Sequence, residues 1–161
     1  MNNMTENENS IRILSRALKM ELFSHRIFFL LENRVCDEEC RDILKRLAVD
    51  ERAHSTFLMS ELEMMGERSS KEAGVDQEQI LKKGISAITR GGPVSIFEQT
   101  INLKQKMIDF YRVSLKAVSD NGIRKILSKF IEMEEKHKRI LNMSLIIARE
   151  NALGQLTHYD D

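Results

Sequence analysis

Two acidic residues in this chain each stand three positions before a histidine. The first pair is Glu51 and His54, and the second is Glu134 and His137. Residues three positions apart share one face of an α-helix, so each pair directs a carboxylate and an imidazole to one place. Iron, manganese and zinc accept carboxylate oxygens and imidazole nitrogens as ligands. The two pairs therefore predict either a metal centre or a layer of ion pairs.

Both pairs lie on the apolar face of a predicted helix. Leu47 and Leu58 continue the face of Glu51 and His54 at helical spacing, and the second pair has similar apolar flanks. An unpaired charge on a buried face is costly. We therefore expect these side chains to pair with one another or to bind a metal.

An offset of 83 positions relates the two halves of the chain and carries Glu51 to Glu134 and His54 to His137. The same offset relates Leu14 to Phe97, Glu21 to Lys104, Phe28 to Tyr111, Leu47 to Phe130 and Leu58 to Leu141. A repeated helical hairpin of this size predicts a four-helix bundle.

The first half of the chain predicts two helices. The first helix begins at Asn9 or Ser10, which are both good N-caps, and ends near Arg34. The second follows Asp37 as its N-cap and ends near Met65.

A long connection leads to the second half. Residues 67–76 are polar and predict a loop, and Gln77–Thr89 predicts a short connecting helix. Ser95 and Glu98 form a capping box that opens the third helix, and after a tight turn the fourth helix runs to about Asn151. The connection is long enough to cross the bundle lengthwise, which would make the third helix parallel to the second.

Composition agrees with an all-α protein. The chain has 161 residues, of which 42% are hydrophobic, 31% are charged and one is proline, and this favours a helical bundle. We expect one domain, a four-helix bundle with a long crossover over residues 10–153. A flexible N-terminal tail, 1–9, would precede it and a C-terminal tail, 154–161, would follow.

Charge and hydropathy argue against two classes of partner. Lys and Arg together number 25, as do Asp and Glu, so no net field indicates nucleic acid or an anionic membrane. No apolar run approaches the roughly 20 residues of a membrane helix. The polar N-terminus is unlike a signal peptide, and we expect a cytoplasmic protein.

The inward positions of the four helices predict one polar layer near the middle of the bundle. Its members are Glu21, Glu51, His54, Lys104, Glu134 and His137, with His25 one turn further along the first helix.

With these residues in place, the chain resembles the rubrerythrin-type branch of the ferritin-like di-iron carboxylate superfamily over about residues 10–150. That family places a Glu on helix 1, Glu-x-x-His on helices 2 and 4, and a further Glu on helix 3. The residues on its metal-ligand positions are Glu21, Glu51, His54, Glu134 and His137. The resemblance implies a four-helix bundle, often dimeric, that binds two irons and reacts with peroxide or dioxygen.

Two departures from the family pattern stand out. The helix 3 glutamate is replaced by Lys104, so this ligand position is degenerate. The rubredoxin module with its paired Cys-x-x-Cys knuckles is also missing. Cys36 and Cys40 have the wrong spacing for it, and we interpret them as ordinary reduced cysteines.

The charge of the layer indicates how Lys104 would affect the number of bound metal ions. In the family pattern, four carboxylates offset two divalent ions. Here three carboxylates and Lys104 leave minus two, which a single divalent ion would neutralise. Alternatively both layer histidines are protonated, and the layer is neutral without metal. His25 is a candidate replacement ligand; its other interpretation is a hydrogen-bonded core histidine.

We therefore expect a metal-binding, rubrerythrin-like homodimer that holds one or two ions. Iron is the preferred metal, manganese and zinc are further candidates, and the function would be oxidoreductase chemistry on peroxide or dioxygen. The alternative is a non-enzymatic bundle with a metal-free, salt-bridged site that serves interaction or sensing. Iron storage is weaker, because nothing in the sequence indicates a cage-forming surface. No redox partner is indicated.

Overall fold

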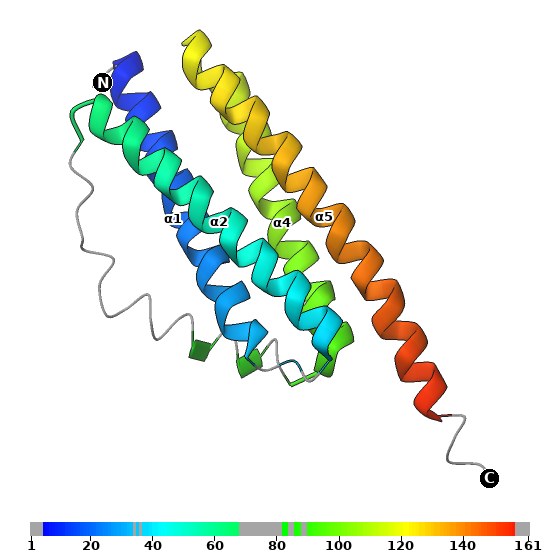
Figure 1. Ribbon diagram of the computed structural model, residues 1–161. Coiled ribbons are helices and arrows are strands. Elements are labelled where there is room, and N and C mark those ends of the chain that lie inside the picture. The colour runs from blue at the N-terminus through cyan, green and yellow to red at the C-terminus, as the bar shows by residue number, and fades with distance from the viewer. Residues whose placement is uncertain are drawn as a thin grey trace.

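Four long helices form a bundle in the computed structural model (Figure 1), which confirms the predicted all-α fold. They are α1 (Glu6–Glu32), α2 (Glu38–Met64), α4 (Gly92–Ala117) and α5 (Asn121–Leu156). The structure describes residues 5–33, 35, 37–67, 82–83, 86–87 and 90–156, without the side chains of the last two.

The helices pack as two hairpins. α1 lies along α2, α4 lies along α5, and a smaller contact joins α1 to α4. Figure 1 shows the chain leaving α2 at one end of the bundle and entering α4 at the other, so α2 and α4 run in the same direction, as the crossover requires. Of the predicted helix Gln77–Thr89, residues 82–83 and 86–87 are described and helical; the remainder lies outside the described residues.

The start of α1 differs from the prediction. The Thr5 hydroxyl accepts a hydrogen bond from the Glu8 amide at 3.2 Å, and the Glu8 carboxylate accepts one from the Thr5 amide at 2.7 Å. This capping box starts the helix at Glu6, ahead of Asn9 and Ser10. The prediction of an N-cap at Asn9 or Ser10 was wrong because the earlier box satisfies the first amides.

The capping box predicted for the third helix was also wrong. α4 begins at Gly92, with Pro93 in its first turn, so Ser95 lies inside the helix. Proline suits a first turn because its φ is already helical and it has no N–H to satisfy. Gly92 has φ +72°, which glycine adopts without strain. Glu98 instead accepts a charged hydrogen bond from Arg149 at 2.8 Å.

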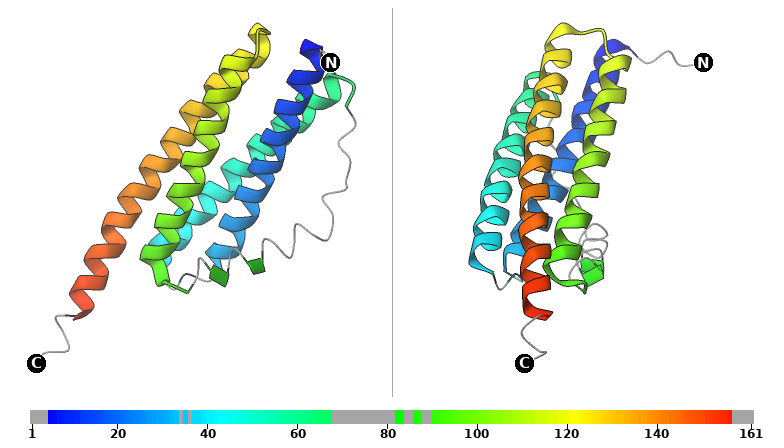
Figure 2. Two further views of the ribbon diagram at one scale, coloured as in Figure 1. Left: turned by 180° about the vertical axis from the view of Figure 1, so that it is seen from behind. Right: turned by 90° about the vertical axis from the view of Figure 1, so that its right-hand side faces the viewer.

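The other helix ends agree better with the sequence. The Asp37 side chain accepts from the Cys40 amide, which confirms it as the N-cap of α2. α5 continues beyond the predicted end at Asn151 as far as Leu156, so residues 154–156 of the predicted tail are helical. Figure 2 shows this end of α5 reaching past the other helices.

Two apolar clusters occupy the interior, one on each side of the middle of the bundle. One contains Phe28, Leu31, Leu44, Leu47, Phe97 and Leu141, and the other contains Leu14, Leu18, Leu58, Tyr111, Leu127 and Phe130. On each helix the predicted polar positions lie between residues of the two clusters. The apolar packing therefore fixes the four helix faces that carry these positions. Within the described residues, no helix is both long and apolar enough to span a membrane.

Candidate metal centre

All four helices contribute to one buried polar layer. α1 supplies Glu21, α4 supplies Lys104, and α2 and α5 supply the Glu-x-x-His pairs. Glu21, Glu51, Lys104 and Glu134 have 0% of their surface exposed, and His137 has 2%. The inward faces predicted by the periodicity thus meet at one level of the bundle.

Lys104 lies between two carboxylates. Its Nζ is 2.6 Å from Glu51 Oε2 and 2.7 Å from Glu134 Oε2. The ammonium also lies 5.2 Å from the centre of the Phe28 ring. Burial alone would lower the pKa of Lys104, but the carboxylates of Glu51 and Glu134 raise it above its usual value. The amine therefore stays charged and holds the two glutamates together.

Glu51 is the most strongly paired carboxylate of the layer. Its second oxygen, Oε1, lies 2.9 Å from His137 Nδ1. Burial acts to raise the pKa of Glu51, but Lys104 and His137 outweigh it and hold the pKa below its usual range. This carboxylate is therefore ionised, with one oxygen on the lysine and one on the imidazole.

Glu21 is held from two sides. Tyr111 donates a hydrogen bond to Glu21 Oε1 at 2.5 Å, and His54 Nδ1 lies 3.2 Å from Oε2. Burial, reinforced by the charge of Glu51, raises the pKa of Glu21. Burial lowers the pKa of His54, which favours the neutral imidazole that a metal requires.

Glu134 has an oxygen without a hydrogen-bond partner. Oε2 contacts Lys104, whereas the buried Oε1 has none; His54 Nδ1 lies 3.8 Å and His137 Nδ1 3.9 Å away. Burial raises the pKa of Glu134 to about 7. Buried carboxylate oxygens are normally satisfied, so this one calls for a proton or a cation.

The donor atoms of four residues converge on one place. One atom each from Glu21, Glu51, His54 and Glu134 lies within 4.8 Å of the others. His137 stands beside this group, with its ring stacked on that of His54 at 5.6 Å between centroids. The oxygen and nitrogen donors and the unpartnered oxygen of Glu134 fit one divalent ion. They do not fit a second, because the Lys104 ammonium lies against Glu51 and Glu134.

The structure does not bring His25 into the layer. Its Nδ1 donates to the carbonyl of Ala48 at 2.8 Å, and the ring is tilted against Phe29. The hydrogen bond agrees with the second interpretation from the sequence, but His25 is half-buried and lies in neither apolar cluster.

Asp50 is a contact that sequence reasoning missed. Its Oδ2 lies 3.1 Å from His137 Nε2, and 55% of its side chain is exposed. His137 thus connects a surface carboxylate to the buried Glu51. The available signal was position, because a residue directly before an inward one lies at the edge of the buried helix face.

Cys40 is buried as a free thiol, and burial raises its pKa to about 12. A thiol with this pKa is unreactive at neutral pH. Cys36 lies outside the described residues.

A four-helix bundle in which a long crossover makes α2 and α4 parallel, with a buried layer of carboxylates and histidines, defines a ferritin-like protein with a candidate metal site. The rubrerythrin family model matches residues 12–145, and the chain belongs to this family. No curated protein and no solved structure matches the chain. Family and donor cluster together support a ferritin-like metal-binding protein.

Proposed function

We propose that this protein binds one divalent metal ion per chain, iron by preference, and that Lys104 replaces the second ion of the family pattern. The observation that carries the proposal is the position of the Lys104 ammonium, 2.6 Å from Glu51 and 2.7 Å from Glu134. The ion would be held by Glu21, His54 and the free oxygen of Glu134.

Charge supports one ion rather than two. With all three glutamates ionised, as metal ligation requires, and both histidines neutral, the layer with its one ammonium carries a charge of minus two. A divalent ion restores neutrality, which matters in an interior where an uncompensated charge is costly. A second divalent ion would be repelled by the fixed ammonium and would leave an excess of positive charge.

The residues of the chain have separate tasks in this proposal. Tyr111 orients Glu21, Lys104 keeps Glu51 ionised and holds Glu134 in place, and burial keeps His54 neutral. A bound ferrous ion would supply electrons for reduction of peroxide or dioxygen. Because one ferrous ion gives up one electron on oxidation to ferric and peroxide reduction takes two, we expect weak peroxidase activity.

Metal content tests the proposal. The protein is purified without chelator, loaded anaerobically with ferrous iron and freed of unbound metal, and iron per chain is then measured. We expect about one iron in the wild type and an increase toward two in Lys104→Glu, which restores the fourth carboxylate. Lys106→Glu is the matched control, since this exposed lysine of α4 undergoes the same charge change outside the layer. Two irons in the wild type, or none, would contradict the proposal.

A second candidate is a metal-free, salt-bridged bundle that serves interaction or sensing. The ion pairs of Lys104 with Glu51 and Glu134, and the contact of His137 with Glu51, favour it, because they already satisfy most of the layer. Protonation of both histidines would make the layer neutral. Under this candidate, no metal copurifies and added iron, manganese or zinc leaves the melting temperature unchanged.

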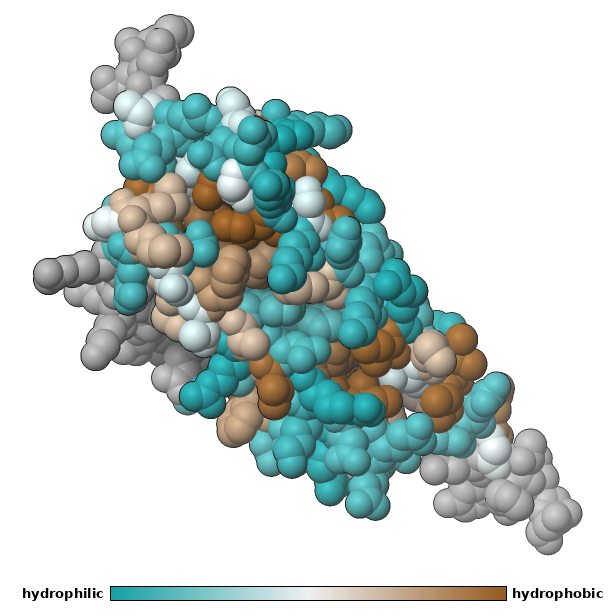
Figure 3. Space-filling model, turned by 45° about the horizontal axis from the view of Figure 1, so that its top comes forward, coloured by the Kyte–Doolittle hydropathy of each residue, from teal (hydrophilic) through white to brown (hydrophobic). Residues whose placement is uncertain are grey.

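We also propose a homodimer. Exposed apolar side chains on α2 and α5 support it: Val49 is 63%, Met143 67% and Ile146 56% exposed. Val49 and Met143 line a groove of about 690 Å³ between the two helices. Figure 3 shows further apolar side chains near the C-terminal end of α5, at the lower right. Analytical ultracentrifugation tests the dimer: we expect the wild type to sediment as a dimer and the Met143→Glu variant as a monomer. A wild type that sediments as a monomer, with the same sedimentation coefficient as the variant, would contradict the proposal.

The free thiol of Cys40 supports a reducing compartment, and we propose a cytoplasmic location. Fractionation of the source cells tests it; recovery outside the cytoplasm would overturn it.

A further inference from the structure

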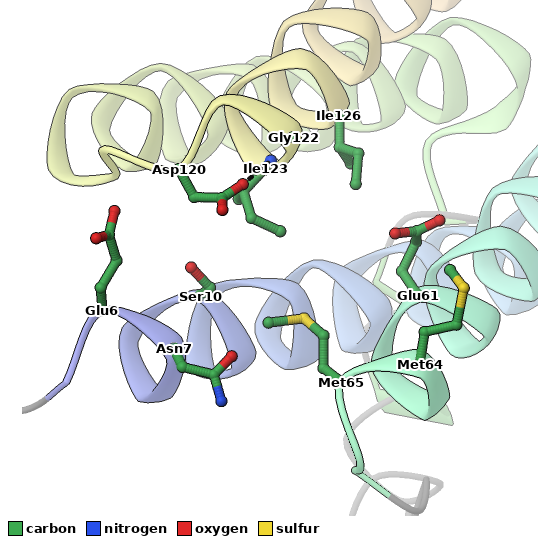
Figure 4. A pocket seen from close by; sticks show the side chains of 10 residues that line it. All are labelled: Glu6, Asn7, Ser10, Glu61, Met64, Met65, Asp120, Gly122, Ile123 and Ile126. Carbon is green, nitrogen blue, oxygen red and sulfur yellow. Dashed lines mark hydrogen bonds between the residues drawn. The ribbon is translucent and has the colours of Figure 1, made fainter.

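A second polar cavity lies at the end of the bundle where α1 begins, α2 ends and α5 begins (Figure 4). It is a groove of about 500 Å³, and its lining residue nearest in sequence to the metal layer, Glu61, lies seven positions, about two helical turns, beyond His54. Three carboxylates line it, those of Glu6, Glu61 and Asp120, and no lysine or arginine is among its lining residues. The groove therefore favours a cation.

The three carboxylates are spread along the groove. Figure 4 shows Glu6 and Asp120 toward one end and Glu61 toward the other. Asp120 Oδ1 accepts from the Ile123 amide at 2.8 Å, which leaves its second oxygen for a ligand. Among the described residues, the metal layer is the group of acidic and histidine side chains whose donor atoms converge within 4.8 Å. The groove carboxylates do not converge in this way, so they do not form the cage of one bare metal ion.

Ser10 gives an independent indication of a ligand. The residue is 2% exposed, and its hydroxyl points into the groove toward α5 (Figure 4). Within the part of the chain that the structure describes, this hydroxyl has no hydrogen-bond partner. The hydroxyl is open to the groove, so it is available to hydrogen-bond a polar group bound there.

The space between the two ends is apolar. Met65 and Ile123 line it. The flexible thioether of Met65 and the branched alkyl chain of Ile123 can pack against a methylene chain, such as the one that joins the amino groups of a long amine. An alkylammonium has three N–H donors, which can be met by Glu6, Ser10 and Asp120 at one end.

From this arrangement we propose that the groove binds an aliphatic diamine or polyamine. One ammonium lies among Glu6, Ser10 and Asp120, the methylene chain lies against Met65 and Ile123, and the second ammonium lies at Glu61.

Calorimetric titration of the full chain at low salt tests this. The ligands are 1,5-diaminopentane, pentylamine as the monoamine of equal chain length, and magnesium chloride. We expect the diamine to bind at least tenfold more tightly than pentylamine or magnesium. Glu61→Gln should reduce diamine binding to the level of pentylamine, and Ser10→Ala should weaken both amines several-fold. Glu63→Gln is the matched control, because this exposed glutamate lies two residues away and does not line the groove.

Equal affinity for diamine and monoamine would overturn the proposal, as would magnesium binding of equal strength, which would identify an unspecific acidic surface. The same follows if Glu63→Gln weakens diamine binding as much as Glu61→Gln. An N-acetylated peptide with a single lysine that binds as tightly as the diamine would also overturn it, since one ammonium would then be sufficient. Circular dichroism of each variant checks that the helices are intact.

Discussion

Lys104 Nζ lies 2.7 Å from one oxygen of Glu134, while the other oxygen of that carboxylate has no hydrogen-bond partner. One side chain thus combines a satisfied ion pair with an open donor atom. The lysine takes the charge-compensating role at one end of the layer, and the open oxygen leaves room for a cation at the other. This relationship makes Lys104 a determinant of stability as well as of metal number.

Lys104→Met should destabilise the metal-free protein by about 3–5 kcal/mol, because Glu51 and Glu134 would face each other without a cation. Urea unfolding after dialysis against chelator measures the free energy of unfolding. Lys106→Met, at the exposed neighbouring position, should stay within about 0.5 kcal/mol of the wild type. Equal stability of the two variants would show that the lysine does not stabilise the layer.

Replacement of His54 or His137 by alanine should cost about 2–4 kcal/mol, since each imidazole contacts a buried glutamate. Thermal and urea unfolding give the change. Thr56→Ala on the exposed face of α2 serves as reference. If both histidine variants have the melting temperature of the wild type, the contacts of His54 with Glu21 and of His137 with Glu51 do not stabilise the protein.

Asp50→Ala should weaken iron binding by about 10–100-fold, the magnitude typical of hydrogen-bonding partners outside the ligand shell. The reason is that His137, which contacts Glu51 of the donor group, would lose its contact at Nε2. Competition with a chromophoric chelator measures the affinity. Asp42→Ala, an exposed aspartate on the same helix, controls for net charge. Asp50→Asn retains a hydrogen-bonding side chain and should recover part of the affinity. If Asp50→Ala binds iron with unchanged affinity, the contact between Asp50 and His137 does not contribute to metal binding.

Cys40 should resist thiol reagents in the folded protein. Burial raises its pKa to about 12, so almost no thiolate forms at pH 8. The measurement uses the Cys36→Ser variant, which leaves one thiol, and follows its reaction with a chromogenic disulfide in buffer and in urea. We expect at least tenfold slower reaction in buffer. The contribution of this thiol to stability is fully present below its unfolded pKa of about 8.5 and is lost as pH rises toward 12. Equal rates in both conditions would show an accessible thiol.

Prediction of the fold succeeded where the signal was local. Helical periodicity is a property of neighbouring residues, so the faces of all four helices could be read directly, and the 83-residue repeat indicated the bundle. The helix starts at Glu6 and Gly92 were missed because several candidate caps compete within a few residues. Which cap is used depends on how the whole helix packs.

By itself, the sequence determined that Glu21, Glu51, Lys104 and Glu134 face one interior, because a turn of 3.6 residues places them on the apolar stripes. It also determined which ionisable side chains the layer contains. Only the tertiary structure decided that Lys104 contacts both Glu51 and Glu134, that Asp50 reaches His137, and that His25 turns to the carbonyl of Ala48. These partners come from different helices, and side-chain contacts across a bundle depend on how the helices pack and which rotamers that packing permits.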